Sequence, residues 1–154
     1  MLTSLDEILL QRDKKILFVG VGNVLKMDDG VGVYICNGIK NNNHYLTLPV
    51  EVSIENYIGK INTINPDILV LVDCVNMNKV PGTYKLFPIC EIHDLTFNTH
   101  NISLKRLAEF FKMPTFILGI QPKKTDFGET ISQTVLKAAD KIILLINKHE
   151  FCNV

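Results

Sequence analysis

Three runs of consecutive apolar residues mark the chain, at 16–21, 68–72 and 115–120. Short apolar runs without polar alternation are typical of strands that are buried on both faces of a parallel sheet. Residues 50–54 and 84–87 predict two shorter strands. Only about ten residues join the 84–87 strand to the strand before it, too few for a helical crossover. We therefore expect the 84–87 strand to run antiparallel to its neighbours.

Between these runs, apolar residues recur every three or four positions, which predicts amphipathic helices. One helix must end before Pro66. Another is expected after a cap at Ser103, and the last from Thr130, where Gln133 completes a capping box, to near Lys148. The positions that define these helices are Val31, Tyr34, Ile35 and Gly38; Ile54, Ile58 and Ile61; Leu104, Leu107, Ala108 and Phe111; and Ile131, Val135, Ala138, Ala139, Ile142 and Leu145.

Strands that alternate with helices predict an α/β fold. We expect a three-layer sandwich, with a mostly parallel central sheet of about five strands flanked by helices. A length of 154 residues fits one domain spanning 1–154, in which residues 1–14 form a short N-terminal segment.

Composition excludes several classes of protein. The 16 basic and 16 acidic residues cancel, and no basic stripe indicates nucleic-acid binding. No apolar stretch approaches the roughly 20 residues that cross a bilayer, and acidic residues interrupt the N-terminus, so neither a membrane span nor a signal peptide is expected. We expect a cytoplasmic protein whose four separated cysteines are free thiols, with Cys36 and Cys74 in the core.

In α/β folds, ligands bind beyond the carboxyl ends of the strands. The loop after the first strand opens as Gly20-Val21-Gly22, like a dinucleotide-binding fingerprint, but Leu25 stands where the third glycine belongs. Asp28 and Asp29 would also repel a pyrophosphate at the following helix. A nucleotide-binding α/β module therefore stays as an alternative. One of the two aspartates can cap the helix while the other points into the crevice.

Two further polar residues are expected at the same edge. Asp73 follows the apolar run 68–72, and His100 lies in a loop just before a predicted helix. Each residue alone is ordinary, as a turn aspartate or a solvated histidine, and His93 is a weaker candidate. Together with Asp29 they offer two carboxylates and one imidazole, a set that suits nickel, zinc, manganese or iron. A metal-dependent hydrolase with its own resident divalent ion is thus a second alternative.

Four blocks of the chain resemble the hydrogenase maturation proteases, in the same order and over about residues 15–146. The branch that serves hydrogenase 3 and related enzymes is the most similar. The first signature and the histidine block are specific, whereas the apolar strands are not. The blocks are 20–32 (GVGNVLKMDDGVG), 71–74 followed by Pro81-Gly82, 99–104 (THNISL), and 118–122 followed by Gly128 and Ser132.

The resemblance implies an endopeptidase that removes the C-terminal extension of a nickel-loaded [NiFe]-hydrogenase large-subunit precursor. Asp29, Asp73 and His100 fall on the family's metal-reading positions, so the resemblance implies that they bind nickel supplied by the substrate rather than a resident cofactor. The chain departs from the family after the second strand, where residues 51–55 replace an Asp-Gly-Gly stretch. Residues 55–56 still match the Glu-Asn that opens the next helix in the family.

The usual protease nucleophiles have no motif here, since both a Gly-x-Ser-x-Gly elbow and a His-Glu-x-x-His helix are missing from the sequence. An amide can instead be cut by an activated water while a metal polarises the carbonyl, and we take this as the hypothesis. In that scheme Asp28 is a further catalytic candidate, as a base or as the residue that orients the water. The missing nucleophile also leaves a pure scaffold role open.

Overall fold

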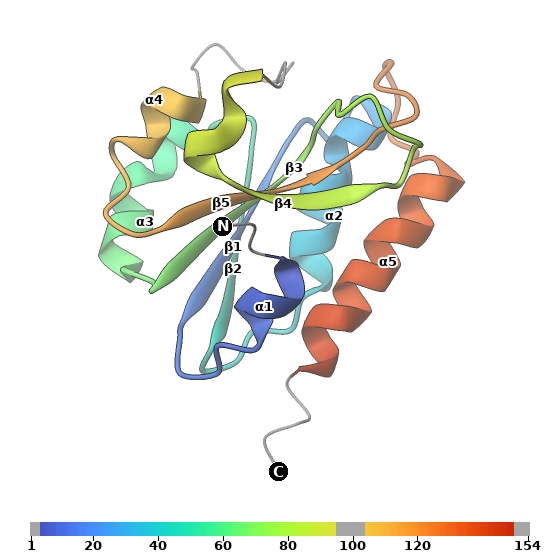
Figure 1. The fold of residues 1–154 in the computed structure, drawn as a ribbon. Coiled ribbons are helices and arrows are strands. Elements are labelled where there is room, and N and C mark those ends of the chain that lie inside the picture. The colour runs from blue at the N-terminus through green and yellow to red at the C-terminus, as the bar shows by residue number, and fades with distance from the viewer. Residues whose placement is uncertain (1–3, 95–103, 150–154) are drawn as a thin grey trace.

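A single five-stranded sheet organises the protein, in the order β2-β1-β3-β5-β4 (Figure 1). The computed structural model describes residues 4–94 and 104–149. The strands are β1 (Ile16–Val21), β2 (Tyr45–Glu51), β3 (Ile68–Cys74), β4 (Tyr84–Pro88) and β5 (Thr115–Ile120). The α-helices are α1 (Leu5–Leu9), α2 (Val31–Gly38), α3 (Ile58–Ile64), α4 (Leu104–Ala108) and α5 (Gln133–Lys148), and the 3-10 helices are η1 (Met27–Gly30), η2 (Ile54–Tyr57) and η3 (Ile89–Asp94).

The sheet has the predicted mixed direction. Strands β2, β1, β3 and β5 pair in parallel, whereas β4 pairs antiparallel with β5, from Tyr84 opposite Ile120 to Pro88 opposite Phe116. The carboxyl ends of the four parallel strands therefore meet at one side of the sheet, which we call the carboxyl edge. The loops that follow β1, β2, β3 and β5 all begin at this edge.

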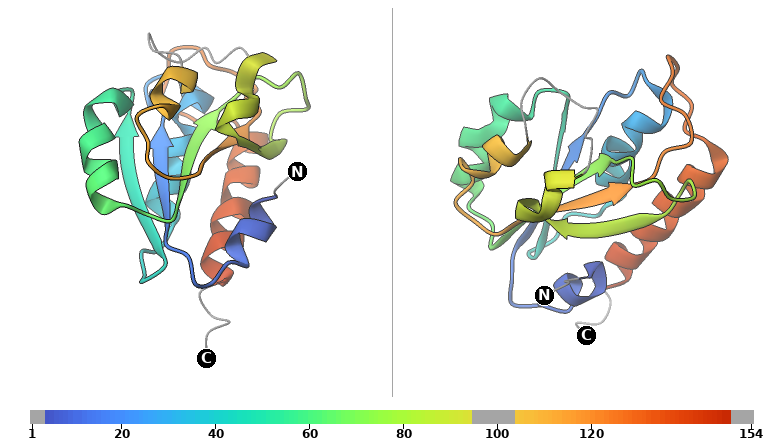
Figure 2. Two further views of the ribbon diagram at one scale, coloured as in Figure 1. Left: turned by 60° about the vertical axis from the view of Figure 1, so that its left-hand side comes forward. Right: turned by 45° about the horizontal axis from the view of Figure 1, so that its top comes forward.

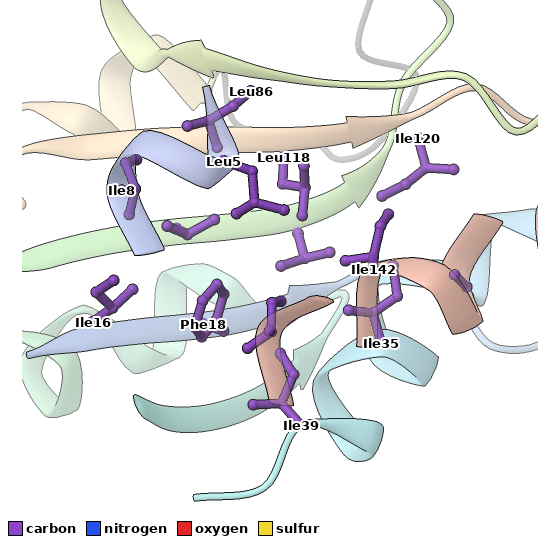
Figure 3. Close-up of a cluster of buried hydrophobic side chains, with 14 of the residues drawn as sticks. Leu5, Ile8, Ile16, Phe18, Ile35, Ile39, Leu86, Leu118, Ile120 and Ile142 are labelled. Carbon is purple, nitrogen blue, oxygen red and sulfur yellow. The ribbon is translucent and has the colours of Figure 1, made fainter. Parts of the chain in front are cut away.

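Helices cover both faces of the sheet and make three layers, as predicted. Helices α1, α2 and α5 lie on one face, and α3 and α4 lie on the other (Figures 1 and 2). On the first face, apolar side chains of β1 and β3 pack against Ile8, Ile35 and Ile142 (Figure 3). On the second, the opposite side chains of the same strands pack against Ile54, Ile61 and Leu107. None of the helices in the described part of the chain is long and apolar enough to cross a membrane.

Two glycines let α2 lie directly on the sheet. A Cβ atom on Gly32 would lie 2.1 Å from the carbonyl oxygen of Val72 and 2.6 Å from that of Val21. A Cβ on Gly20 would lie 2.8 Å from Cβ of Cys36. The close helix packing that the dinucleotide fingerprint obtains from its third glycine is therefore provided by Gly32, seven residues beyond Leu25.

Two predicted boundaries were wrong. The strand expected at 50–54 is β2, which begins at Tyr45 and ends at Glu51, where the backbone turns left-handed with φ of 55°. The pattern was hard to read because β2 is an edge strand with mixed burial. The last helix begins at Gln133 rather than Thr130, and Ser132 makes no side-chain cap because its hydroxyl binds elsewhere. Along this helix Ile146 is fully buried, while Leu145 is partly buried.

Other predicted ends shift by a few residues. Asp73 lies inside β3 rather than after it, since the strand continues to Cys74. Helix α4 ends at Ala108, so Phe111 is buried just beyond the helix. The predicted cap Ser103 lies outside the described residues.

Replacing Gly32 with alanine should destabilise the protein by at least about 2 kcal/mol, because the new methyl group overlaps backbone oxygens that cannot move without shifting β1 and β3. The matched control is Gly59→Ala in α3, where an added Cβ has no neighbour within 4 Å. That change should stabilise the helix by about 0.5–1 kcal/mol. Chemical denaturation of both variants checks this, and equal stability of the two would contradict the close approach of α2.

Candidate functional site

The predicted acids Asp29 and Asp73 meet around Gly22, at the carboxyl edge. Gly22 follows β1 with φ of 133°, a conformation that favours glycine. A Cβ atom placed on it would lie 1.9 Å from the carbonyl oxygen of Asp29 and 3.5 Å from Oδ1 of Asp73. The glycine therefore lets the loop after β1 close against the end of β3.

Asp29 belongs to η1 and has only 7% of its surface exposed. Its Oδ2 accepts a hydrogen bond of 2.8 Å from the backbone N–H of Asn23, and the side chain of Asn23 accepts one of 2.9 Å from the N–H of Leu25. These two bonds close residues 23–29 into a compact loop. These bonds within the loop give the Asp29 carboxylate a defined position.

Asp73 is the penultimate residue of β3, and 1% of its surface is exposed. Its Oδ1 accepts a hydrogen bond of 2.7 Å from the N–H of Cys74. Strand β3 lies between β1 and β5, where Asp73 pairs with Gly119. The carboxylate is therefore held at the end of a strand that is paired on both sides.

Cys74 reports the charge that gathers here. Burial raises the pKa of its thiol, and the negative charges of Asp73, Asp29 and Asp28 raise it further. A thiol in such surroundings stays protonated at neutral pH and is a poor nucleophile. Cys74 is buried, as is Cys36, which confirms the prediction that both belong to the core.

Asp28 has surroundings of a different kind. Its side chain is completely buried, and its two oxygens accept four hydrogen bonds from the loop that precedes α5. The donors are the backbone N–H groups of Lys123 (2.9 Å), Lys124 (2.9 Å) and Ser132 (2.6 Å), and the hydroxyl of Ser132 (2.8 Å). All four donors lie in one distant segment of the chain, so Asp28 joins two loops. This geometry favours a structural role for Asp28.

Backbone hydrogen bonds join the same two loops. The N–H of Met27 donates to the carbonyl of Gly128 (2.7 Å), and the N–H of Gly128 donates to the carbonyl of Leu25 (2.8 Å). The N–H of Asp28 donates to the carbonyl of Lys124 (3.0 Å). We call this set of bonds, together with the four at the Asp28 carboxylate, the loop clamp. It joins residues 25–28 to residues 123–132.

The backbone N–H groups of the first loop are already engaged. Those of Gly22, Asn23 and residues 25–29 all donate to oxygens of the protein itself. A phosphate-binding loop needs such groups free to point at its ligand. Phosphate would have to displace several of these bonds, which argues against the nucleotide-binding alternative.

Gln121 supports the site and was not singled out among the candidate residues. It is buried at the end of β5, where its Oε1 accepts hydrogen bonds from the N–H groups of Met77 (2.6 Å) and Lys79 (3.3 Å). Its Nε2 donates to the side chain of Asn76 (3.2 Å). Gln121 therefore orders the loop that follows Asp73. The signal was present, since a polar residue that ends an apolar strand is the feature that identified Asp73.

The third predicted ligand, His100, lies outside the described residues, and the weaker candidate His93 falls in η3. Within residues 4–94 and 104–149, no three side chains of His, Cys, Asp or Glu are grouped to hold a metal ion. The described part of the site is therefore the carboxylate pair, Asp29 and Asp73.

Comparison with known proteins agrees with this architecture. The family model HycI, described as hydrogenase maturation protease, matches residues 52–149. Two proteins of Methanocaldococcus jannaschii that are named for the same activity are similar: one is 32% identical over 151 residues, covering 87% of each chain, and the other 30% identical over 152 residues, covering 88% of this chain and 96% of the relative.

Solved structures share the fold. The [NiFe] hydrogenase maturation protease HycI from Thermococcus kodakarensis superposes with a TM-score of 0.82 at 25% identity, over 95% of this chain and 98% of that one. The endopeptidase HycI from Escherichia coli gives a TM-score of 0.78 at 24% identity, over 88% and 91% of the two chains. The family match, the curated relatives and the fold lead to one conclusion: the chain belongs to the hydrogenase maturation protease family and is an endopeptidase.

Proposed function

We propose that this endopeptidase removes the C-terminal extension from a nickel-loaded [NiFe]-hydrogenase large-subunit precursor. The observation that carries the proposal is that two buried aspartates flank Gly22 at the carboxyl edge, Asp29 with its backbone carbonyl and Asp73 with its carboxylate. The negative charges of both residues raise the pKa of the buried Cys74 thiol, so negative charge gathers at this edge. A cation brought by the substrate would be attracted to it.

The donor set supports nickel as the substrate's cargo. Two carboxylate oxygens and the predicted imidazole of His100 suit a borderline divalent ion, and other positions stay open for ligands from the precursor. Asp73 is held by the sheet and Asp29 by its loop, so the pair is preorganised. In this proposal the enzyme recognises a precursor by the metal that the precursor already holds.

Hydrolysis itself adds one water across one peptide bond. The hydroxyl of the water bonds to the carbonyl carbon, the C–N bond breaks, and a proton passes to the departing amine. A cation close to the scissile bond stabilises the negative charge that develops on the carbonyl oxygen. The contribution of Asp29, Asp73 and His100 is to position that part of the precursor.

We assign Asp28 to holding the clamp rather than to base catalysis. Burial by itself raises the pKa of Asp28, but the hydrogen bonds from Lys124, Ser132 and Lys123 and from the Ser132 hydroxyl outweigh it, so its pKa lies below the usual value. A carboxylate so stabilised is a weak base. Because Asp28 directly precedes Asp29, the clamp that holds Asp28 also limits where Asp29 can lie.

The narrower features of the proposal come from the sequence blocks. From the resemblance of the first signature and the histidine block, we propose a partner of the hydrogenase 3 type. A cytoplasmic location is consistent with nickel insertion into a precursor before it is processed. The matched family model and the carboxylate pair support an enzyme more strongly than a scaffold.

Wild-type enzyme should shorten a nickel-loaded precursor at its C-terminus, and prior removal of nickel from the precursor should stop the reaction, because the carboxylate pair then has no cation to bind. Intact mass spectrometry of the precursor measures both results. Cleavage that continues without nickel would leave a peptidase but discard recognition through the metal. Stoichiometric metal in freshly purified enzyme would instead favour a hydrolase with a resident ion.

Asp29→Asn, Asp73→Asn and His100→Ala should each slow processing by more than the roughly 10–100-fold that loss of an outer-shell partner costs. The asparagines keep an oxygen acceptor and similar volume, so the fold should survive. His44→Ala, in the turn before β2, is the control for loss of a histidine and should process normally. Normal processing by His100→Ala would remove that residue from the ligand set.

Asp28→Asn should lower the free energy of unfolding at neutral pH by about 2–4 kcal/mol, because an amide NH2 would face buried N–H donors. Since the folded pKa is lowered, the stability from Asp28 is present above the unfolded pKa of about 3.9 and is lost as the pH falls through the folded pKa. The gap between wild type and variant should therefore narrow below about pH 4. Denaturation at several pH values tests this, with exposed Asp126→Asn as a control that changes stability by less than about 0.5 kcal/mol.

A further inference from the structure

A recess lies beside the loop clamp and is lined in part by η1. Its volume is about 220 Å³, and it is formed where the loop after β1, helix α2 and the segment before α5 meet. The walls are mainly apolar, and a few polar groups stand among them. The lining includes Val24, Met27, Gly30 and Tyr34, and Glu129 is one of its polar residues.

Hydrogen bonds hold two parts of the wall of this recess in place. The hydroxyl of Tyr34 donates a hydrogen bond of 2.7 Å to Oδ1 of Asp140 on α5, which fixes the ring of Tyr34 between two helices. The loop clamp holds another part of the wall, because the backbone N–H of Met27, which lines the recess, donates to the carbonyl of Gly128. A preformed apolar recess can bind without first ordering its own walls.

The size of the recess limits its occupant. Pockets for cofactors and drug-sized ligands usually measure about 300–1,000 Å³. This one is smaller and suits one or two amino-acid side chains. An apolar side chain presented by another protein fits both its volume and its lining.

Exposed apolar residues belong to the two loops that meet at the recess. Val24 forms part of its wall and is 38% exposed, Leu25 is 44% exposed, and Phe127 is 86% exposed. The hydrogen bond between Gly128 and Leu25 holds the last two on neighbouring loops. Figures 1 and 2 show the loop before α5, in orange, beside the start of α2, in light blue. Clustered apolar groups that stay in water are a mark of protein interaction sites.

The recess lies against the element that carries the candidate ligand. Met27 and Gly30 line it, and both belong to η1, in which Asp29 lies between them. A protein segment seated in the recess therefore touches the same single turn of helix that presents Asp29 to the substrate's metal. Contact in the recess and contact at Asp29 therefore both involve η1.

We infer that this recess and its apolar rim, Val24, Leu25 and Phe127, form a docking site for an apolar side chain of the precursor. The inference rests on the proposed function, because an endopeptidase must hold a protein chain and this surface adjoins the metal-reading loop. Docking supplies binding energy that is the same before and during cleavage. Its loss should weaken precursor binding and leave the chemical step intact.

Phe127→Asp tests the site, because this residue lies on an exposed loop outside residues 23–29, where a charge does not disturb the core. It should raise KM for the nickel-loaded precursor about tenfold or more and change kcat by less than about twofold, since a charge now faces an apolar partner. Phe127→Leu, which keeps an apolar side chain, should retain a KM near the wild-type value. Phe110→Asp and Leu144→Asp are matched controls, since their side chains are 58% and 69% exposed on α4's connection to β5 and on α5.

The outcomes separate this inference from the proposed function. Normal processing by wild type, with a KM of Phe127→Asp equal to that of the two controls, overturns the docking site alone. A lower kcat at unchanged KM also overturns it. Failure of wild type to process a nickel-loaded precursor removes both. A wild-type dimer in sedimentation that Phe127→Asp dissociates would assign the surface to a second copy of the chain and overturn the inference.

Discussion

The loop clamp at Asp28 is the interaction on which the site depends. A fully buried carboxylate is costly unless every oxygen is satisfied, and here four protein donors satisfy it. Because the donors come from residues more than ninety positions away, the bond set ties the beginning of the fold to its last loop. The next residue, Asp29, is thereby held in place. Asp28 and Asp29 are neighbours with different surroundings, since Asp28 is bound by the loop before α5 and Asp29 by the N–H of Asn23 in its own loop.

Close backbone packing provides the second constraint. Without side chains at Gly20 and Gly32, α2 lies against the ends of β1 and β3, and without one at Gly22 the first loop reaches Asp73. The opening of the chain resembles a phosphate-binding loop because both need a sharp turn and a helix close to a strand. The two differ in their free N–H groups. Here the N–H groups are used internally, and the carboxylates of Asp29 and Asp73 are buried at the same edge of the sheet.

In the proposed function, one loop element joins metal recognition and protein recognition. The single turn η1 bears Asp29 between Met27 and Gly30, which line the apolar recess. A protease that must recognise both a metal and a protein needs both contacts in a constant relation. The clamp and the Tyr34–Asp140 hydrogen bond hold the recess in a constant position relative to η1. Rigidity at this corner means that little conformational entropy is lost on binding.

The sequence by itself determined the α/β class, the buried strands and the edge at which Asp29 and Asp73 gather, because apolar runs and helical spacing are local signals and strand ends follow from topology. It did not determine the limits of β2, where an edge strand has mixed burial, or the start of α5, where Ser132 binds Asp28 instead of capping the helix. The roles of Asp28, Gln121 and Gly32 could be decided only by the tertiary structure. Their partners lie far away in the chain, and no local pattern records which distant N–H or backbone oxygen will be near once the sheet has formed.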